Sequence, residues 1–464
     1  MLKLFKQYYP IRNIFFFVGE SIFIVLSILL ATWVISGFSF ALLSETYLPK
    51  VVLVGLVLQT CLYYNDLYEF KVSKTFKELG LRLLEALGAA AILLALIFFF
   101  FPEAGIADGV LETSAVVMLG VVISWRYVYM VTLERGIFNQ RIIIMGSGDL
   151  AQNIVKEIQE KKDCGYSISL IMYEEGDQNV WVDFKTLAPI KVADNALNEK
   201  ARDAGAKKVI VALGEKRGRL PIRELLQCRL DGVEVIDGNS FIEMLTGKLI
   251  VRNLNPGWLI FSEGFHKSPV QRVLKRSADI FLSLVLLVLL SPLMAVVAVL
   301  IKLDSQGPII FSQQRAGMGR HKFQIYKFRS MVQNAETSTG PVWAGEDDPR
   351  ITRIGKKIRR LRIDELPQIW NVLKGDMSFV GPRPEREVFI KELVKHIPYY
   401  DARLTVKPGL TGWAQINFSY GASVEDAVEK LNYDLFYIKN VSFLMDMLII
   451  LRTVKIVMFG RGAR

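Results

Sequence analysis

The sequence is poor in the residues that usually hold transition metals. It contains three cysteines and three histidines among 464 residues. The cysteines, Cys61, Cys164 and Cys228, lie far apart and lack the spacing of a metal site, so we expect no zinc centre. The first apolar run is long and has no small-residue cleavage site, so we expect no cleavable signal peptide.

Acidic residues are outnumbered by basic ones, and polar residues are few. Lys and Arg number 57 against 46 Asp and Glu, which gives a net charge of +11 at pH 7. Hydrophobic residues make up 52% of the chain and the mean hydropathy is +0.31, too apolar for an ordinary soluble enzyme. A basic chain fits either nucleic acid or an anionic membrane with phosphorylated substrates. Because the apolar excess sits in long runs, we favour the membrane and expect no nucleic-acid partner.

Four apolar runs in the first part of the chain predict membrane-spanning helices. They fall at about 13–36, 51–68, 83–101 and 114–133. The first, third and fourth are long enough to cross roughly 30 Å of hydrocarbon, whereas Gln59 and Thr60 interrupt the second. Arg126 inside the fourth run is either a functional charge or a side chain that snorkels toward the cytoplasmic end, and we expect the second.

The charges of the connecting loops predict the orientation of these spans. The connector between the third and fourth runs carries three acidic residues and no basic one, whereas basic residues precede the first run and separate the second from the third. Cytoplasmic loops are enriched in Lys and Arg. We therefore expect the N-terminus and everything after Arg135 to lie in the cytoplasm.

The middle of the chain has the pattern of a nucleotide-binding α/β domain. A buried strand at 141–145 is followed by Gly146-Ser-Gly148-Asp-Leu-Ala151 and a helical pattern, the G-x-G-x-x-A form of the dinucleotide fingerprint. A second strand ends at Glu174 and Glu175, which are candidates for contacts to a ribose. The tight turn needs its glycines whether or not anything binds, so we expect a degenerate or regulatory Rossmann-like domain rather than a catalytic one.

A fifth apolar run, Ile280 to Ile301, has no charged residue in 22 positions. Length alone predicts a transmembrane helix, but basic residues flank it on both sides, and both ends therefore favour the cytoplasm. Ser291-Pro292 lies at its midpoint, where proline removes a helical hydrogen bond and bends the axis, and the Ser hydroxyl could satisfy the freed carbonyl. We expect a re-entrant hairpin over about 277–303, with a kinked full span as the alternative.

Two adjacent carboxylates, Asp364 and Glu365, come directly before a helix-like segment that begins near Pro367. A helix N-terminus attracts phosphate and favours an ionised carboxylate nearby. Such a carboxylate serves as a metal ligand, a general base or a nucleophile. The plainer interpretation is an N-cap Asp with a first-turn Glu.

Two further segments allow two interpretations each. Lys327 and Arg329 are two residues apart on an expected strand, so their side chains share one face. That face is either a phosphate clamp or a solvated basic edge.

The apolar run Val441–Phe459 is interrupted by three charges. It fits an interfacial amphipathic helix or a buried helix packed on the hairpin.

From about residue 270 to its end, the chain resembles the monotopic phosphoglycosyl transferases, the bacterial sugar transferases that act on polyprenyl phosphate. The resemblance rests on the kinked apolar helix and on motifs that follow in order: Lys327-Phe-Arg329-Ser-Met331, Asp364-Glu365-Leu-Pro-Gln368, Gly375-Asp-Met377, Gly381-Pro382-Arg383-Pro384-Glu385 and Pro408-Gly-Leu-Thr-Gly-Trp413. The four spans and the Rossmann-like domain look like those of the large form of the family. There the extra domains are non-catalytic and contribute to dimerisation or regulation.

The resemblance implies a two-step reaction. Asp364 attacks the β-phosphorus of a UDP-sugar, expels UMP and forms an aspartyl phosphosugar, which then passes to undecaprenyl phosphate. Glu365 helps to hold Mg²⁺. The residues implied in substrate binding are Lys327, Arg329, Pro382, Arg383, Pro384 and Glu385, while Ser291 and Pro292 form the membrane hairpin.

The expected fold class is therefore membrane α plus α/β. It consists of a four-helix transmembrane bundle at 1–136, a Rossmann-like cytoplasmic domain at 137–262, and an α/β catalytic domain with a re-entrant membrane helix at 263–464. The expected location is the bacterial inner membrane, with the lipid bilayer, a UDP-sugar, polyprenyl phosphate and a second copy of the chain as partners.

Two other functions compete with this one. A membrane-bound nucleotide-sugar dehydratase also pairs membrane spans with a Rossmann-like domain, but it needs a Tyr-x-x-x-Lys pair. None of the 16 tyrosines has Lys four residues on. A non-catalytic scaffold that senses nucleotide through Gly146–Ala151 would have no use for the intact carboxylate pair.

Overall fold

The computed structural model divides the chain into two compact units, one mainly of residues 9–236 and the other mainly of residues 237–464. The residues that it describes are 2–4, 7–9, 11–37, 47–68, 76–106, 109–136, 138–161, 164–173, 190–191, 197–213, 220–253, 264–265, 268–333, 348–418, 421 and 423–458.

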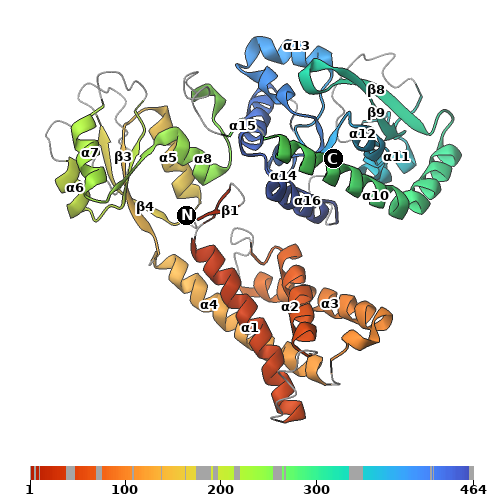
Figure 1. Cartoon of the computed structure of the whole chain (residues 1–464), viewed down its shortest axis with the longest axis horizontal. Helices are drawn as coiled ribbons and strands as arrows, with labels where there is room; N and C mark the ends of the chain where they lie inside the picture. Colours follow the sequence, from red (N-terminus) through yellow and green to blue (C-terminus); the bar gives the residue numbers. More distant parts are fainter. Residues whose placement is uncertain are drawn as a thin grey trace. The chain divides into compact units, whose positions relative to one another are not determined.

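The first unit begins with four apolar helices, α1 (Ile11–Ser36), α2 (Tyr47–Tyr64), α3 (Phe76–Phe100) and α4 (Val110–Glu134). Each is long and apolar enough to cross a membrane, as the sequence predicted, although α2 begins before the expected residue 51. Helix α1 packs along α4 and α2 packs along α3 (Figure 1). Their outer faces leave large apolar side chains such as Phe99 and Val116 exposed, as expected for helices that face lipid.

Arg126 does not snorkel. Its Nη2 lies 2.7 Å from Oε1 of Glu20 on α1, and both side chains are buried. Its guanidinium also lies 5.4 Å from the ring centre of Phe16. The expectation that Arg126 reaches for the surface is wrong, because Glu20 provides an opposite charge between α1 and α4, where an unpaired buried charge is costly.

The rest of the first unit is an α/β domain. Its five-stranded sheet has the order β5 (Ile190–Lys191), β4 (Tyr166–Tyr173), β3 (Gln140–Met145), β6 (Lys208–Val211) and β7 (Glu234–Asp237). Strand β3 pairs in parallel with β4 and with β6. The helices are α5 (Asp149–Glu160), α6 (Leu197–Asp203) and α7 (Ile222–Leu230). The predicted parallel α/β domain is confirmed, and Ile142–Met145 of β3 are fully buried, as in a central parallel strand.

The turn after β3 needs glycine for packing. Gly146 has φ +126°, and a Cβ at this residue would lie 2.4 Å from the carbonyl oxygen of Ala212. The fold itself therefore requires the first glycine of the fingerprint. The candidate ribose contacts Glu174 and Glu175 lie outside the described residues.

The second unit begins earlier than the sequence suggested. Helix α8 (Gly238–Thr246) lies within the expected middle domain, yet its Glu243 accepts from Lys439 Nζ at 2.6 Å. Trp413 Nε1 donates to the carbonyl of Gly247 at 2.7 Å, and Val251 N donates to Asn432 Oδ1 at 2.9 Å. These contacts attach residues 238–253 to the C-terminal unit, whereas the expected boundary was at 262.

The C-terminal unit surrounds one large apolar core that includes Phe379, Leu435 and Ile449. Strands β8 (Ile310–Ala316) and β9 (Lys322–Phe328) form an antiparallel hairpin, and β10 (Ser378–Val380) pairs in parallel with β11 (Gly409–Thr411). The helices, with the 3-10 turns marked η, are η3 (Val251–Asn253), α10 (Pro269–Asp304), η4 (Met318–Arg320), α11 (Arg353–Arg360), η5 (Ile363–Glu365), α12 (Gln368–Lys374), α13 (Glu387–His396), η6 (Tyr400–Thr405), α14 (Trp413–Asn417), α15 (Val424–Asn440) and α16 (Phe443–Met458).

Helix α10 is 36 residues long and carries Pro292 inside it. Within the described ranges it is the fifth helix that is long and apolar enough to cross a membrane. Ser291 Oγ donates to the carbonyl of Val288 at 2.8 Å. That carbonyl lies four residues before Pro292 and loses its helical partner to the proline, so the expected role of the serine hydroxyl is confirmed.

Helix α16 combines the two interpretations of the C-terminal run. Met445, Asp446 and Ile449 are buried against the unit, whereas Leu444 and Leu451 are each half exposed. One face of α16 therefore packs on the core, and the other presents apolar side chains outward.

Candidate active site

The two adjacent carboxylates lie in the short turn η5, just before α12. Arg362 has φ +57° and turns the chain into η5. Both Asp364 and Glu365 are only 8% exposed. Helix α12 starts at Gln368 with Pro367 as its N-cap residue and has no side-chain cap, so the plainer interpretation of Asp364 as a helix cap is wrong.

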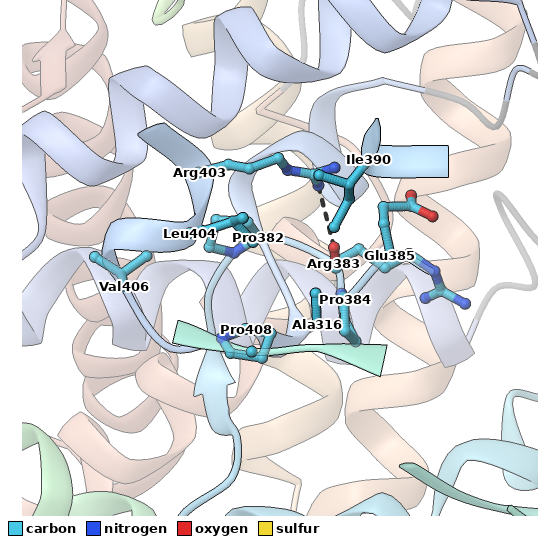
Figure 2. Close-up of a pocket in the computed structure, with 11 residues that line it drawn as sticks. Ala316, Pro382, Arg383, Pro384, Glu385, Ile390, Arg403, Leu404, Val406 and Pro408 are labelled. Atoms are coloured by element: carbon cyan, nitrogen blue, oxygen red, sulfur yellow. Dashed lines mark hydrogen bonds between the residues drawn. The ribbon is translucent and has the colours of Figure 1, made fainter. Parts of the chain in front are cut away.

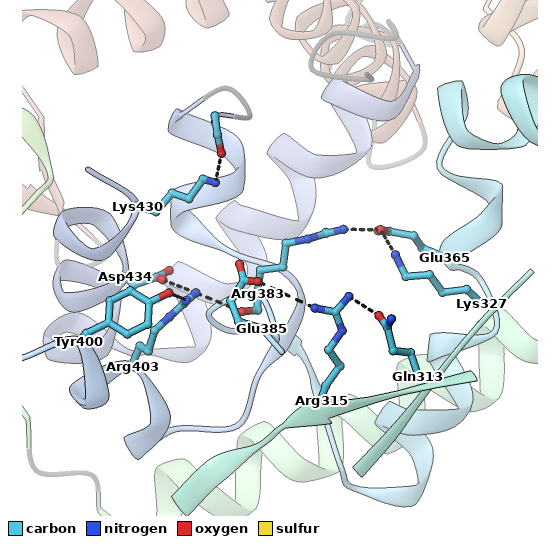
Figure 3. Close-up of polar contacts among 11 residues, drawn as sticks. Gln313, Arg315, Lys327, Glu365, Arg383, Glu385, Tyr400, Arg403, Lys430 and Asp434 are labelled. Carbon is cyan, nitrogen blue, oxygen red and sulfur yellow. Dashed lines mark hydrogen bonds and ion pairs between the residues drawn. The ribbon is translucent and has the colours of Figure 1, made fainter. Parts of the chain in front are cut away.

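Glu365 is held by cations on three sides. Its Oε1 accepts from Lys327 Nζ at 3.0 Å and from Arg383 Nη2 at 2.8 Å (Figure 3), while Arg362 Nη1 lies 3.9 Å from Oε2. Burial alone would raise the pKa of Glu365, but Arg383, Lys327 and Arg362 outweigh it and hold that pKa well below its usual range. Glu365 is therefore a fixed anion.

Asp364 is different from its neighbour. Within the described part of the chain, its carboxylate accepts no hydrogen bond, although it is almost fully buried. Burial and the charge of Glu365 raise its pKa to about 6, against the opposing pull of Lys327, Arg359 and Arg383. A largely buried carboxylate that no described donor holds in place is free to react, which favours a nucleophile or a base over a structural anion.

Arg359 is a residue that the motifs did not single out. It lies on α11, five residues before Asp364, and its charge acts on that carboxylate. The only sequence signal is its place in the basic run 353–362, where nothing marks it from the other cations.

The proline-rich segment Gly381–Glu385 follows β10, and α10 and α15 fix its start. The carboxylate of Asp279 accepts from Phe379 N at 3.1 Å. The carbonyl of Val380 accepts from Lys275 Nζ and from the Tyr437 hydroxyl, each at 3.0 Å. Both lysine and tyrosine also contact Asp446 of α16, at 2.6 and 2.8 Å.

Arg403 fixes the centre of the same segment. Its Nη2 donates to the backbone carbonyl of Arg383 at 3.1 Å and to Asp434 Oδ2 at 3.0 Å (Figure 3). Arg403 also donates to the Tyr400 hydroxyl. Arg403 and Asp434 are both buried, and burial raises the pKa of Asp434 to about 6, although Arg403 opposes that shift. Neither Arg403 nor Asp434 was among the expected site residues, because nothing in the sequence pairs them.

A small cavity lies beside this segment (Figure 2). Pro382, Pro384 and Glu385 line it together with Ala316 and Arg403. Its volume is about 10 Å³, enough for at most one water molecule. The carboxylate of Glu385 lies 3.9 Å from Arg315. The structure thus gathers the expected residues of the segment around one hollow, which is far smaller than a nucleotide.

Arg329 is not brought to the carboxylate pair with Lys327. Strand β9 ends at Phe328, and the Arg329 guanidinium donates to the carbonyls of Ser305 and Pro308, each at 2.6 Å. These carbonyls follow the C-terminus of α10, where a cation is favoured. The expected alternation fails because Arg329 lies past the strand, and its contacts describe a buried structural arginine.

The two carboxylates are donors of the kind that Mg²⁺ binds. No group of three or more His, Cys, Asp or Glu able to hold a metal occurs among the described residues. Asp364 and Glu365 offer two oxygen donors, and Mg²⁺ is commonly bound through one or two carboxylates together with substrate phosphates.

Comparison with protein families gives two matches. Residues 270–460 match the family described as bacterial sugar transferase, which spans α10 to α16 and includes the carboxylate pair. Residues 64–227 match a family described as CoA-binding domain.

Individual relatives agree with the first match. The chain is 45% identical over 242 residues, 52% of its length, to a UDP-N-acetylgalactosamine-undecaprenyl-phosphate N-acetylgalactosaminephosphotransferase of Aeromonas hydrophila, and covers 56% of that protein. It is 42% identical over 191 residues, 40% of each chain, to a UDP-glucose:undecaprenyl-phosphate glucose-1-phosphate transferase of Escherichia coli. It is 30% identical over 345 residues, 71% of its length, to an undecaprenyl-phosphate galactose phosphotransferase of Salmonella typhimurium, of which it covers 70%.

The first of these matches spans about half the length of its relative, whereas the Salmonella match extends well beyond the C-terminal unit. The apolar α10, the buried carboxylate pair and the cations around it all lie in the matched region. The chain belongs to the bacterial sugar transferase family.

Proposed function

We propose that this protein transfers a hexose-1-phosphate from a UDP-sugar to a polyprenyl phosphate, as the first membrane step of polysaccharide synthesis. The observation that carries the proposal is the contrast inside the carboxylate pair. Glu365 is clamped by Lys327 and Arg383, while Asp364 is buried and accepts no hydrogen bond from the described residues. The names of the relatives support the class of reaction, and because those names differ in the sugar, the proposal is made for hexose-1-phosphates in general.

In the first step, an oxygen of the ionised Asp364 attacks the β-phosphorus of the donor. The bond from that phosphorus to the bridging oxygen breaks, UMP leaves with the electron pair, and an aspartyl phosphosugar remains. In the second step, an oxygen of the polyprenyl phosphate attacks the same phosphorus and releases the Asp364 carboxylate. Two displacements suit one anchored site that meets a soluble donor first and a lipid acceptor second.

The cations around the pair suit a diphosphate. Lys327, Arg359 and Arg383 all act on the carboxylate pair, and a bound diphosphate would compete with Glu365 for Lys327 and Arg383. Glu365, with Asp364, would then hold Mg²⁺, which when bound supplies positive charge to the phosphates and the leaving UMP. Pro382, Pro384 and Glu385 line the small cavity beside Arg383, and in this proposal they contact the substrate.

We further propose that α10 is re-entrant and that both its ends lie on the cytoplasmic face of the bacterial inner membrane. The guanidinium of Arg276 binds the carbonyls of Val372 and Leu373, each at 2.7 Å. Near the other end, Ile301 lies in an apolar cluster against which Leu366 packs. A straight helix would separate residues 276 and 301 by about 37 Å, whereas residues 366 and 372 lie only about 9 Å apart along a helix. A bend in α10 explains this better than a kinked full span.

The proposal also assigns roles to the four apolar helices and to the α/β domain of the first unit. The four helices α1–α4 cross the same membrane, and the α/β domain, Rossmann-like in its fingerprint, serves a regulatory role or the assembly of a homodimer. The Gly146 turn is required by packing, so that glycine by itself does not indicate a bound nucleotide.

The reaction is tested by UMP release from a panel of UDP-sugars, with the full chain in nanodiscs that contain undecaprenyl phosphate and Mg²⁺. We expect release from at least one donor by the native chain and none by Asp364→Asn. Asp401→Asn is the matched control, because Asp401 is exposed and pairs with Arg320. Absence of release from every donor would overturn the proposed reaction, and full activity of Asp364→Asn would favour a different nucleophile.

A further inference from the structure

Helix α11 carries a row of cations on one face. Arg353, Lys356, Lys357 and Arg360 follow the spacing i, i+3, i+4 and i+7, and all four are exposed. Residues with this spacing share one side of a helix. Ile358 on the opposite side is buried in the apolar cluster with Val297 and Ile301 of α10. We name the four cations the basic face of α11.

The basic face is fixed next to the C-terminal end of α10. The carboxylate of Asp304, the last residue of α10, accepts from Ile354 N of α11 at 3.1 Å. Thr352 Oγ1 accepts from Gly355 N at 2.9 Å and caps the same helix end. Side chains on α10 and the start of α11 thus anchor the position of α11, independently of its exposed cations.

Apolar side chains are exposed near the basic face, at the end of α10 and directly after α11. Leu303 in the last turn of α10 is 79% exposed and Leu300 is 41% exposed. Leu361, directly after α11, is 50% exposed. Exposed leucines beside a row of lysines and arginines are typical of a surface that lies in the interface of an anionic bilayer.

The row of like charges is unfavourable by itself. Cations at i, i+3 and i+4 repel one another and destabilise an isolated helix. For Lys357 and Arg360, no ion pair or side-chain hydrogen bond is formed within the described residues. A surface of negative charge would relieve this repulsion, and the exposed leucines make a nucleic acid a poor partner.

We propose that the basic face of α11 binds the phosphate headgroups of anionic phospholipids, with the last turns of α10 in the hydrocarbon beside them. Asp364 follows Arg360 by four residues, and the charge of Arg359 on the same helix acts on that carboxylate. Binding of α11 to headgroups therefore sets the depth of the carboxylate pair relative to the membrane. The inference concerns the lipid surface and does not depend on which reaction the site performs.

The test is hydrogen–deuterium exchange of the full chain in nanodiscs, read over peptides that cover residues 350–362. One set of discs contains phosphatidylcholine only, and the other contains phosphatidylcholine with 30% phosphatidylglycerol. We expect slower exchange of these peptides in the anionic discs. In the variant Lys357→Gln/Arg360→Gln the lipid-dependent protection should fall by roughly fivefold for each charge removed. High salt should weaken the protection in the native chain.

The matched control is Lys391→Gln/Lys395→Gln on α13, which removes the same charge from another exposed face of the unit. It should keep the lipid dependence of the native chain. Equal exchange in both kinds of disc would overturn the proposal, as would undiminished protection in the α11 variant. Protection that is equally strong in detergent, or that rises with protein concentration, would assign the face to another part of the chain or to a second copy, and would also overturn it.

Discussion

Arg403 reaches the backbone of Arg383 rather than its side chain. The Nη2 atom of Arg403 lies 3.1 Å from the carbonyl oxygen of Arg383, and the Arg383 side chain extends away to Glu365 at 2.8 Å. The buried Asp434 holds Arg403 from behind at 3.0 Å. A chain of charged contacts therefore runs from Asp434 on α15 to the carboxylate pair (Figure 3), and Arg403 and Asp434 are positioning residues for Arg383.

Replacing Asp434 by Asn should affect both stability and turnover. Removing one partner of a buried ion pair leaves Arg403 as an uncompensated buried charge, which costs about 3–5 kcal/mol. The shift of the Arg383 segment should lower kcat/KM by about 10–100-fold. Thermal unfolding and UMP release measure the two effects. Asp401→Asn serves as the control, and equal behaviour of the two variants would contradict the positioning role.

Turnover should depend on pH through Asp364. In the proposed reaction, only the ionised carboxylate of Asp364 attacks phosphorus. The pKa of Asp364 is raised to about 6, so its ionised fraction is nearly complete at pH 8 and falls as the pH drops through 6. The rate of UMP release in the first step should be level above about pH 7 and should fall by roughly tenfold per pH unit well below 6. A single-turnover pH series without the lipid acceptor measures this, and a flat profile between pH 5 and 8 would be inconsistent with it.

Replacing Glu365 by Gln should move that pH profile. The charge of Glu365 is the second cause, after burial, of the raised pKa of Asp364. Its removal should shift the midpoint to lower pH. It should also lower the rate, because Lys327 and Arg383 lose their partner and the proposed Mg²⁺ site loses a donor. The pH series at several Mg²⁺ concentrations separates the two effects. A midpoint that stays in place or rises would argue against coupling of the two carboxylates.

Replacing Lys327 should mainly lower turnover, whereas replacing Arg329 should mainly lower stability. Lys327→Met removes a cation from the carboxylate pair and should reduce turnover by about a hundredfold with little change in unfolding. Arg329→Lys leaves buried carbonyls near the end of α10 without donors and should cost about 1–3 kcal/mol of stability. Thermal unfolding and UMP release of both variants, measured side by side, decide the matter. A large loss of turnover in a fully stable Arg329→Lys variant would indicate that Arg329 binds the substrate.

The sequence alone predicted the helices, the strand and the motifs that are set by residues close together in the chain. Apolar runs of sufficient length predicted α1–α4 and α10, because the thickness of a bilayer sets the number of residues. The buried run at 141–145 predicted the central parallel strand. Asp364, Glu365 and the Gly381–Glu385 segment were found by chemistry and order along the chain, which needs no knowledge of the fold.

Only the tertiary structure decided which of these residues meet. Arg403 and Asp434 are separated by 31 positions and Arg126 and Glu20 by 106, and no local pattern links either pair. The alternation that placed Arg329 beside Lys327 held only to the end of β9, and α8 joined the C-terminal unit through contacts with α15. Buried charges must find partners wherever packing brings them, so the pairs that shape the site follow from the packed fold, whereas periodicity and composition follow from the chain itself.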